Sequence, residues 1–221
     1  MTLLEIRLNR RHPPNHKIGV ILVERYVEQI SIKAGMSISQ LLEAMGRSGV
    51  LGAGNLGRAL DVTLEMFSSL NYMVFLTLAG PMVPGGLRRI VRILIDRGLV
   101  NAIVASGANL VHDIIEALGY RGVQGSFAVD DARLRAKNIG RAGDIYFPHD
   151  GFEALEKKTY EVLDRIRVRR DSLSVSEFLV EYGAFLQDED SILKASVTKK
   201  IPVFCPAILD SMLGLHMWTY S

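Results

Sequence analysis

The chain has 221 residues, of which 48% are hydrophobic and 23% are charged, and its formal net charge is +2. This composition excludes a disordered chain, and so small a net charge does not indicate nucleic acid or an anionic membrane as a partner. No apolar run reaches the roughly 18 residues of a membrane span. Cys205, the only cysteine, lies in an apolar stretch and is expected to be a buried thiol. We therefore expect a cytoplasmic protein without an intrachain disulfide.

Residues 1–70 have the pattern of a helical region. Ser37 stands three residues before Gln40, which is the spacing of a capping box, and Gly46 is the expected end of that helix. A second helix is predicted over residues 55–70, where apolar residues recur at helical spacing.

The hexapeptide Gly52–Gly57 has the G-x-G-x-x-G spacing of dinucleotide-binding turns. Such a turn follows a strand, and an acidic residue about 20 positions later binds the ribose hydroxyls. Here the motif follows a predicted helix, and residues 73–78 contain no acid. We therefore interpret it as a glycine-rich connection between two helices, with Asn55 capping the second helix.

Residues 71–221 have the pattern of a parallel α/β domain. Two apolar segments, residues 73–79 and 101–106, are each followed by a loop of small residues and an amphipathic helix. Repeated strand–loop–helix units predict a parallel sheet with right-handed crossovers and helices on both faces. The first of these helices is expected to bury Leu87, Ile90, Val91 and Leu94. Further strands are predicted at residues 143–148 and 201–207, and further helices at 152–169 and from Ser174 onward.

The loops at residues 79–86 and 105–109 are candidates for binding a ligand. In an open parallel sheet, ligands bind beyond the carboxyl ends of the strands, and small residues allow the backbone to approach them closely. Each loop leads into a helix N-terminus, whose free N–H groups favour anions. Together the loops are suited to a dinucleotide; the alternative is that they are ordinary tight turns.

Three polar residues near these loops are candidate site residues. His112 and Asp113 are placed in the first turn of a helix, where Asp113 complements the helix dipole and His112 is expected to be neutral or paired. Asp210 follows the last predicted strand and either binds sugar hydroxyls or caps a helix.

The segments GNLGRAL, GPMVPGGLRRIV, ASGANLVHDIIEALG, NIGRAGDIYFP and IPVFCPAILDSMLG resemble deoxyhypusine synthase, particularly its archaeal-type members, from about Ile38 to the last residue. The resemblance implies a Rossmann-like parallel α/β fold that binds NAD without the standard fingerprint. It also implies a homotetramer with active sites at subunit interfaces. The implied reaction transfers the aminobutyl group of spermidine to a lysine of the precursor of translation initiation factor 5A, by way of an imine on an enzyme lysine.

The resemblance also assigns roles to single residues. The resemblance implies that the loops at residues 79–86 and 105–109 contact the cofactor. An aspartate and a histidine are also implied to contact it, and the histidine contacts the polyamine as well. The resemblance implies no metal site, and Leu215 stands where some members have a polyamine-binding carboxylate. The cofactor residues are Gly80, Pro81, Met82, Val83, Pro84, Ser106, Gly107, Ala108, His112 and Asp210.

No catalytic residue is assigned in this chain, because the nucleophilic lysine, in a Trp-Gly-Lys type of motif, is expected beyond Ser221. Relative to the family, residues 71–221 are therefore expected to be an incomplete NAD-binding domain. Lys199 and Lys200 do not match the motif. Two alternatives stay open: an aminobutyltransferase like homospermidine synthase, and a truncated non-catalytic subunit. On these expectations, Gly107→Val blocks NAD binding and Gly54→Val leaves it largely intact.

Overall fold

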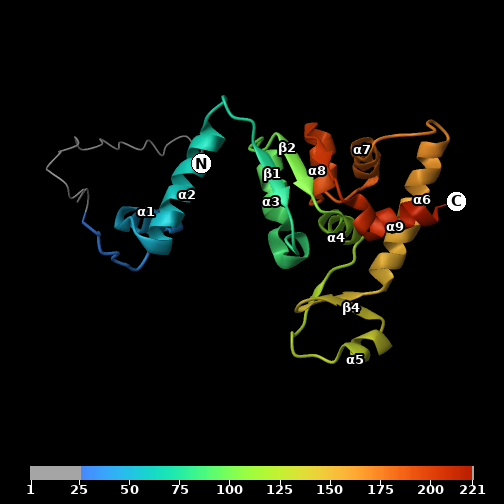
Figure 1. Cartoon of the computed structure of the whole chain (residues 1–221), viewed down its shortest axis with the longest axis horizontal. Coiled ribbons are helices and arrows are strands. Elements are labelled where there is room, and N and C mark those ends of the chain that lie inside the picture. Colours follow the sequence, from blue (N-terminus) through green and yellow to red (C-terminus); the bar gives the residue numbers. More distant parts are fainter. Residues whose placement is uncertain (1–25, 221) are drawn as a thin grey trace. The chain divides into compact units, whose positions relative to one another are not determined.

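The computed structural model describes residues 26–220, so residues 1–25 of the predicted helical region lie outside the described residues. The chain divides into two compact units, Met1–Ser68 and Ser69–Ser221, each of which is described here by itself. Figure 1 labels the α-helices of both units and the strands β1, β2 and β4. None of the described helices is long and apolar enough to cross a membrane.

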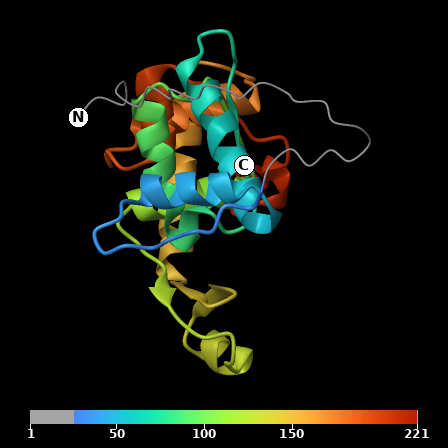
Figure 2. The ribbon, with the colours of Figure 1, turned by 90° about the vertical axis from the view of Figure 1, so that its left-hand side faces the viewer.

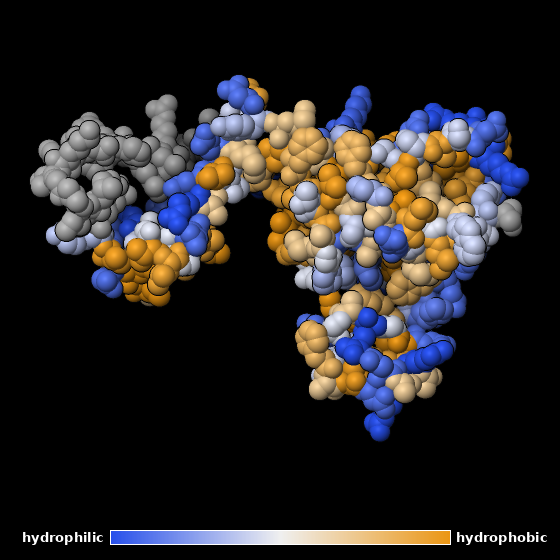
Figure 3. Space-filling view, viewed as in Figure 1, coloured by the Kyte–Doolittle hydropathy of each residue, from blue (hydrophilic) through white to orange (hydrophobic). Residues whose placement is uncertain are grey.

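The first unit is a helical hairpin made of α1 (Ile38–Ser48) and α2 (Leu51–Ser68). The predicted capping box is confirmed: the Gln40 N–H donates to Ser37 Oγ at 3.2 Å, and the Ser37 N–H donates to Gln40 Oε1 at 2.9 Å. The helix continues past the predicted end and is capped by Gly49, whose φ of 74° favours glycine. Figure 3 shows hydrophobic residues gathered on the surface of this hairpin around α1.

The glycine motif lies inside α2, so its interpretation as a connection between helices is wrong, and Asn55 is not a cap. A Cβ atom on Gly57 would overlap the Gly46 Cα, and one on Gly54 would overlap the backbone of Gly49. Because glycine has no Cβ, the backbones of α1 and α2 approach each other at these points. The motif is therefore a packing device of the hairpin.

The second unit contains a parallel sheet of β1 (Phe75–Leu78), β2 (Ala102–Ala105) and β6 (Val203–Phe204), in the order β1-β2-β6. The predicted α/β fold with a parallel sheet is confirmed. Helix α4 contacts α6, α8 and α9, and α3 contacts α8. The helices of this unit are α3 (Arg88–Asp96), α4 (Gly107–Ala117), α5 (Asp131–Ala136), α6 (Asp150–Arg167), α7 (Val175–Phe185), α8 (Ile192–Lys199) and α9 (Met212–Thr219).

Burial differs between the two faces of the parallel sheet. The register and the alternation of side chains place Ile103 and Val203 together on one face, where both are buried. The same alternation places Phe75 and Phe204 on the opposite face, where they are 55% and 42% exposed. The helices of the second unit therefore cover one face more completely than the other.

The predicted strand at residues 143–148 belongs to a second, antiparallel sheet. This sheet has the order β3-β5-β4, with β3 (Val123–Gln124), β4 (Ile139–Ala142) and β5 (Ile145–Pro148). A two-residue turn joins β4 to β5, and its first residue, Gly143, has a φ of 63°. Figures 1 and 2 show that this sheet and α5 project from the rest of the second unit.

Two helical glycines of α2 provide a matched test of the hairpin contact. Gly57→Ala is expected to lower the free energy of unfolding by roughly 1–3 kcal/mol, because its methyl group overlaps the backbone of Gly46. Gly52→Ala meets nothing within 4 Å and is expected to be neutral or stabilising, by up to about 1 kcal/mol. Denaturant unfolding followed by circular dichroism at 222 nm compares the two; equal stabilities would contradict the packing role.

Candidate functional site

The segments that follow the three parallel strands meet at the carboxyl edge of the sheet. Asn109 Nδ2 donates to the Gly80 carbonyl at 2.9 Å and to Ser106 Oγ at 3.0 Å, which joins the segment after β1 to the segment after β2. A Cβ atom on Gly107 would lie 2.5 Å from the Ser211 Cβ, which places the segment after β6 against the same helix start. The two predicted cofactor loops and Asp210 therefore lie around the N-terminus of α4.

The predicted cofactor residues differ in how much of their surface reaches solvent. Val83 and Gly107 are buried, so the Val83 side chain packs in the core and Gly107 allows close packing against Ser211. Asp210 lies in a short 3-10 turn, and Ser211 rather than Asp210 caps α9. The exposed residues are Gly80, Pro81, Met82, Ala108 and Asp210, and the half-buried ones are Pro84, Ser106 and His112.

Asn109 was not singled out by sequence reasoning, although it holds both loops. Its side chain is 1% exposed, and its Oδ1 accepts a hydrogen bond from the Val83 N–H at 2.9 Å. With the two bonds donated by Nδ2, the amide satisfies one backbone donor, one backbone acceptor and one hydroxyl. A local signal existed in a polar residue next to the apolar Leu110 and Val111 at the start of the helix, but nothing in the sequence identified its partners.

The start of α4 offers free backbone donors. Ser106 is the N-cap residue, but its hydroxyl accepts from Asn109 and makes no capping bond to the helix backbone. Within the described part of the chain, the N–H groups of Gly107 and Ala108 have no acceptor. Free N–H groups at the positive end of a helix dipole favour a negatively charged ligand.

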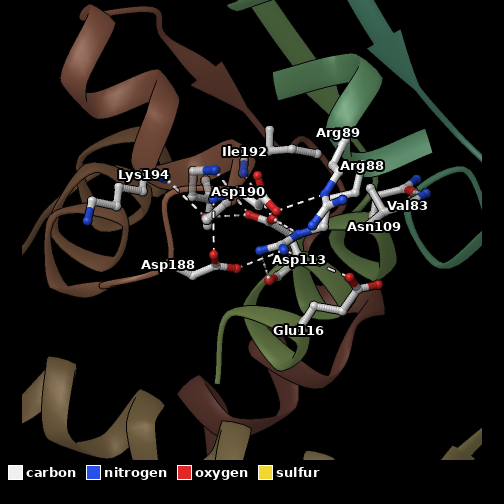
Figure 4. A network of polar contacts seen from close by, with 12 residues as sticks. Val83, Arg88, Arg89, Asn109, Asp113, Glu116, Asp188, Asp190, Ile192 and Lys194 are labelled. Atoms are coloured by element: carbon white, nitrogen blue, oxygen red, sulfur yellow. Dashed lines mark hydrogen bonds and ion pairs between the residues drawn. The ribbon is translucent and has the colours of Figure 1, made fainter. Parts of the chain in front are cut away.

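Asp113 is the centre of a buried polar network (Figure 4). Its carboxylate is fully buried and accepts hydrogen bonds from Arg88 Nε at 2.7 Å and from Ser191 Oγ at 2.9 Å. It also accepts from the N–H groups of Ile192 at 2.9 Å and Leu193 at 3.0 Å, which begin α8. The predicted role of Asp113 is therefore corrected: it lies in the second turn of α4 and stabilises the N-terminus of another helix.

Arg88 extends this network from α3. It bonds Asp188 at 2.8 Å and lies 3.8 Å from Glu116. Burial by itself lowers the pKa of Arg88, but Asp113 and Asp188 together raise it above its ordinary value. Burial raises the pKa of Glu116. The predicted apolar stripe of α3 is wrong in part, because Ile90 is exposed and Arg88 occupies the buried face with Val91 and Ile95.

The polar residues of α4 form one stripe along the helix. Ser106, Asn109, Asp113 and Glu116 are spaced by three, four and three residues, which places them on one side of a helix. Asn109, which also bonds Ser106, holds the segment after β1 at Gly80 and Val83, whereas Asp113 and Glu116 hold it at Arg88. One face of α4 therefore fixes both ends of the crossover that leads into α3.

His112 lies against two aromatic rings. Its ring centroid is 4.4 Å from that of Phe147 and 6.3 Å from that of Phe152. Burial lowers its pKa from 6.5 to about 4, so the imidazole is neutral near pH 7. Burial likewise raises the pKa of the Cys205 thiol to about 11, which makes Cys205 a packing residue.

The model of the deoxyhypusine synthase family matches residues 40–221 of this chain. A probable deoxyhypusine synthase of Methanothermobacter thermautotrophicus is 41% identical over 198 residues, which are 88% of this chain and 63% of the relative. This chain belongs to the deoxyhypusine synthase family. A probable deoxyhypusine synthase 1 of Archaeoglobus fulgidus is 40% identical over 190 residues, which are 86% of this chain and 61% of the relative.

A solved structure agrees in fold. A crystallised protein of Entamoeba histolytica described as a deoxyhypusine synthase has a TM-score of 0.61 at 19% identity and covers 83% of this chain and 63% of its own. Deoxyhypusine synthases are transferases of hypusine biosynthesis, and the predicted family is confirmed. The chain spans about three fifths of the length of the curated relatives that it matches.

Two pockets lie in the second unit. One, of about 590 Å³, lies between α5 and β4 and is lined by Asp131 and Arg141. The other, of about 260 Å³, is lined by charged residues of the Arg88 network and by Val83 and Gly86 of the first predicted cofactor loop. Among residues 26–220, no group of three or more His, Cys, Asp and Glu side chains is placed to hold a metal ion. The second pocket therefore adjoins the first predicted cofactor loop, whereas Gly80, Ala108 and Asp210 lie on the open surface of the chain.

We predict that removing a buried carboxylate lowers the free energy of unfolding more than removing an exposed one. Asp113→Asn is expected to lower the free energy of unfolding by roughly 3 kcal/mol or more, because Arg88 stays buried with its charge only partly compensated. Asp190→Asn removes the exposed ion pair with Arg89 and is expected to cost less than about 1 kcal/mol. Urea unfolding of the two variants tests this; equal midpoints would contradict a central role for Asp113.

The lowered pKa of His112 predicts a pH-dependent loss of stability. In the unfolded chain, histidine titrates near 6.5, whereas in the folded chain His112 titrates at about 4. Between these pH values the unfolded state binds more protons, so His112 stabilises the fold above this window and loses that contribution as the pH falls through it. His112→Gln is expected to flatten the fall in unfolding free energy between about pH 6.5 and 4. Parallel curves for the two proteins would show that His112 is exposed to protonation in the fold.

Proposed function

We propose that this chain forms the cofactor-binding part of an enzyme that uses NAD to transfer the aminobutyl group of spermidine to a lysine of the translation initiation factor 5A precursor. One observation carries the proposal. The two loops and Asp210 lie around the N-terminus of α4, at the carboxyl edge of a parallel sheet. This edge is the place where open α/β sheets bind nucleotide ligands.

The residues at this edge fit the parts of a dinucleotide. The free N–H groups of Gly107 and Ala108 are suited to the pyrophosphate, and the exposed Asp210 carboxylate is suited to accept hydrogen bonds from ribose hydroxyls. Gly80 has a φ of 65° and no atom within 4 Å of a Cβ position, so the backbone is open to close approach there. NAD, when bound, would take up a hydride from spermidine and later return it.

The protein's own residues have defined tasks in this proposal. Neutral His112 has one nitrogen that accepts a hydrogen bond, so it is suited to an N–H group of the polyamine and adds no repelling charge. Lys199 and Lys200 are exposed at the end of α8, where no burial favours the neutral amine that a nucleophile requires. Neither lysine is therefore assigned as the nucleophile.

We also propose that the site is completed by other copies of the chain in a homotetramer. The candidate edge is an open surface in one chain, and Leu209 and Trp218 are exposed on the segments after β6. Exposed apolar side chains of this size are typical of surfaces that another protein covers.

The structure changes which substitutions test the cofactor site. Gly107→Val collides with Ser211, and Gly54→Val collides with the backbone of Gly49. Each substitution therefore disturbs packing whether or not NAD binds. Ala108 is a better position, because it is exposed and lies in the first turn of α4.

Ala108→Asp is expected to lower the affinity for NAD roughly tenfold or more, because it places a negative charge where the pyrophosphate is proposed to bind. The fold itself should tolerate the change, since an acid in the first turn complements the helix dipole. Ala136→Asp adds the same charge on exposed α5 and serves as the matched control. Calorimetric titration with NAD compares the wild type and the two variants. Equal affinities would show that the N-terminus of α4 does not bind the cofactor, and no binding by the wild type would show that NAD is not its ligand.

A further inference from the structure

Asn109 is set apart from the other residues at the carboxyl edge because it is polar, buried and fully used within the protein. Its three hydrogen bonds reach the Gly80 carbonyl, the Val83 N–H and Ser106 Oγ. At 1% exposure the side chain has no surface left for a ligand. Any effect that it has on a ligand must therefore pass through the groups that it holds.

The bonds to Gly80 and Val83 fix the turn of the first loop. Gly80 has a positive φ, and a π-helical turn at Val83–Leu87 follows with a second positive φ at Gly86. No atom lies within 4 Å of a Cβ position built on either glycine. The turn has its own backbone hydrogen bonds, from Met82 to Gly80 and from Gly85 to Pro81. The bonds of Asn109 to Gly80 and Val83 add to these and tie the turn to α4.

The bond to Ser106 affects the second loop in a different way. A serine at the N-cap position ordinarily uses its hydroxyl to accept a bond from the second or third N–H of the helix. Here Ser106 Oγ accepts from Asn109 Nδ2 and makes no capping bond, and the helix N–H groups of Gly107 and Ala108 stay without an acceptor in the described part of the chain. The hydroxyl is thus directed toward Asn109, and the helix start is open to a ligand.

We infer that Asn109 is a positioning residue that sets the spacing of the two loops and leaves the α4 N–H groups free for the anionic part of the dinucleotide. The inference rests on the proposed function for its ligand, but the restraint on the loops is a property of the chain alone. Asn109 would thus set the geometry of the ligand site without contacting the ligand.

The test combines hydrogen exchange with NAD titration of the full chain. Asn109→Ala is expected to speed amide exchange in peptides that cover residues 79–88 and 106–110, and to weaken NAD binding roughly tenfold or more. Thr159→Val is the matched control, because Thr159 is also a buried polar residue with two contacts, to the Leu155 carbonyl and the Tyr182 hydroxyl. The control is expected to lower the unfolding temperature without changing either readout.

A second variant keeps the inference testable if Asn109→Ala does not fold. Asn109→Asp retains an oxygen acceptor for the Val83 N–H but loses both donors. It is expected to keep protection at Val83 while exchange at residues 106–110 rises. Only exchange is compared for this variant, because its added negative charge acts directly on an anionic ligand.

The outcomes separate the inference from the proposed function. Unchanged exchange in the loops overturns the inference, and so does faster exchange with unchanged NAD affinity. If the wild type binds no NAD, the proposed function fails. In that case, exchange in the loops of Asn109→Ala still decides whether the restraint exists.

Discussion

The second unit depends on one buried carboxylate. Asp113 joins three helices: it lies on α4, pairs with Arg88 of α3, and accepts hydrogen bonds from the first N–H groups of α8. A buried charge is costly unless it is paired and hydrogen-bonded, and here both carboxylate oxygens have partners. The helix dipole of α8 and the guanidinium of Arg88 supply the compensating charge. The orientation of α4, and with it the candidate site at its N-terminus, follows from this arrangement.

Local sequence patterns predicted the helices and strands better than the contacts between them. The capping box at Ser37, the helix start at Ser174 and the two strand–loop–helix units are where local patterns placed them. Local spacing carries this information because a capping box or an apolar strand depends on neighbouring residues. The antiparallel pairing of residues 145–148 was not predicted, because strand pairing depends on contacts that single-strand patterns do not record.

The candidate site was predicted at the level of loops and not of side-chain partners. The resemblance and the expected sheet edge indicated residues 80–84 and 106–108, but the residues that hold these loops together were missed. Asn109 and Arg88 are polar residues on buried helix faces, which hydropathy periodicity treats as exceptions. Asp113 was noticed, but its role was assigned to its own helix because its partners lie 25 and 78 residues away in the sequence.

The two glycine-rich segments of this chain show why spacing alone does not define a cofactor site. Gly54 and Gly57 satisfy a dinucleotide fingerprint, but they lie inside a helix, and the backbones of Gly49 and Gly46 fill the space of their missing side chains. Gly80 and Gly86 satisfy no such fingerprint, but they lie in the loop between β1 and α3 with open space at their Cβ positions. A ligand has room to approach the backbone at Gly80 and Gly86 but not at Gly54 and Gly57. Spacing alone does not distinguish the packed glycines of this chain from the open ones.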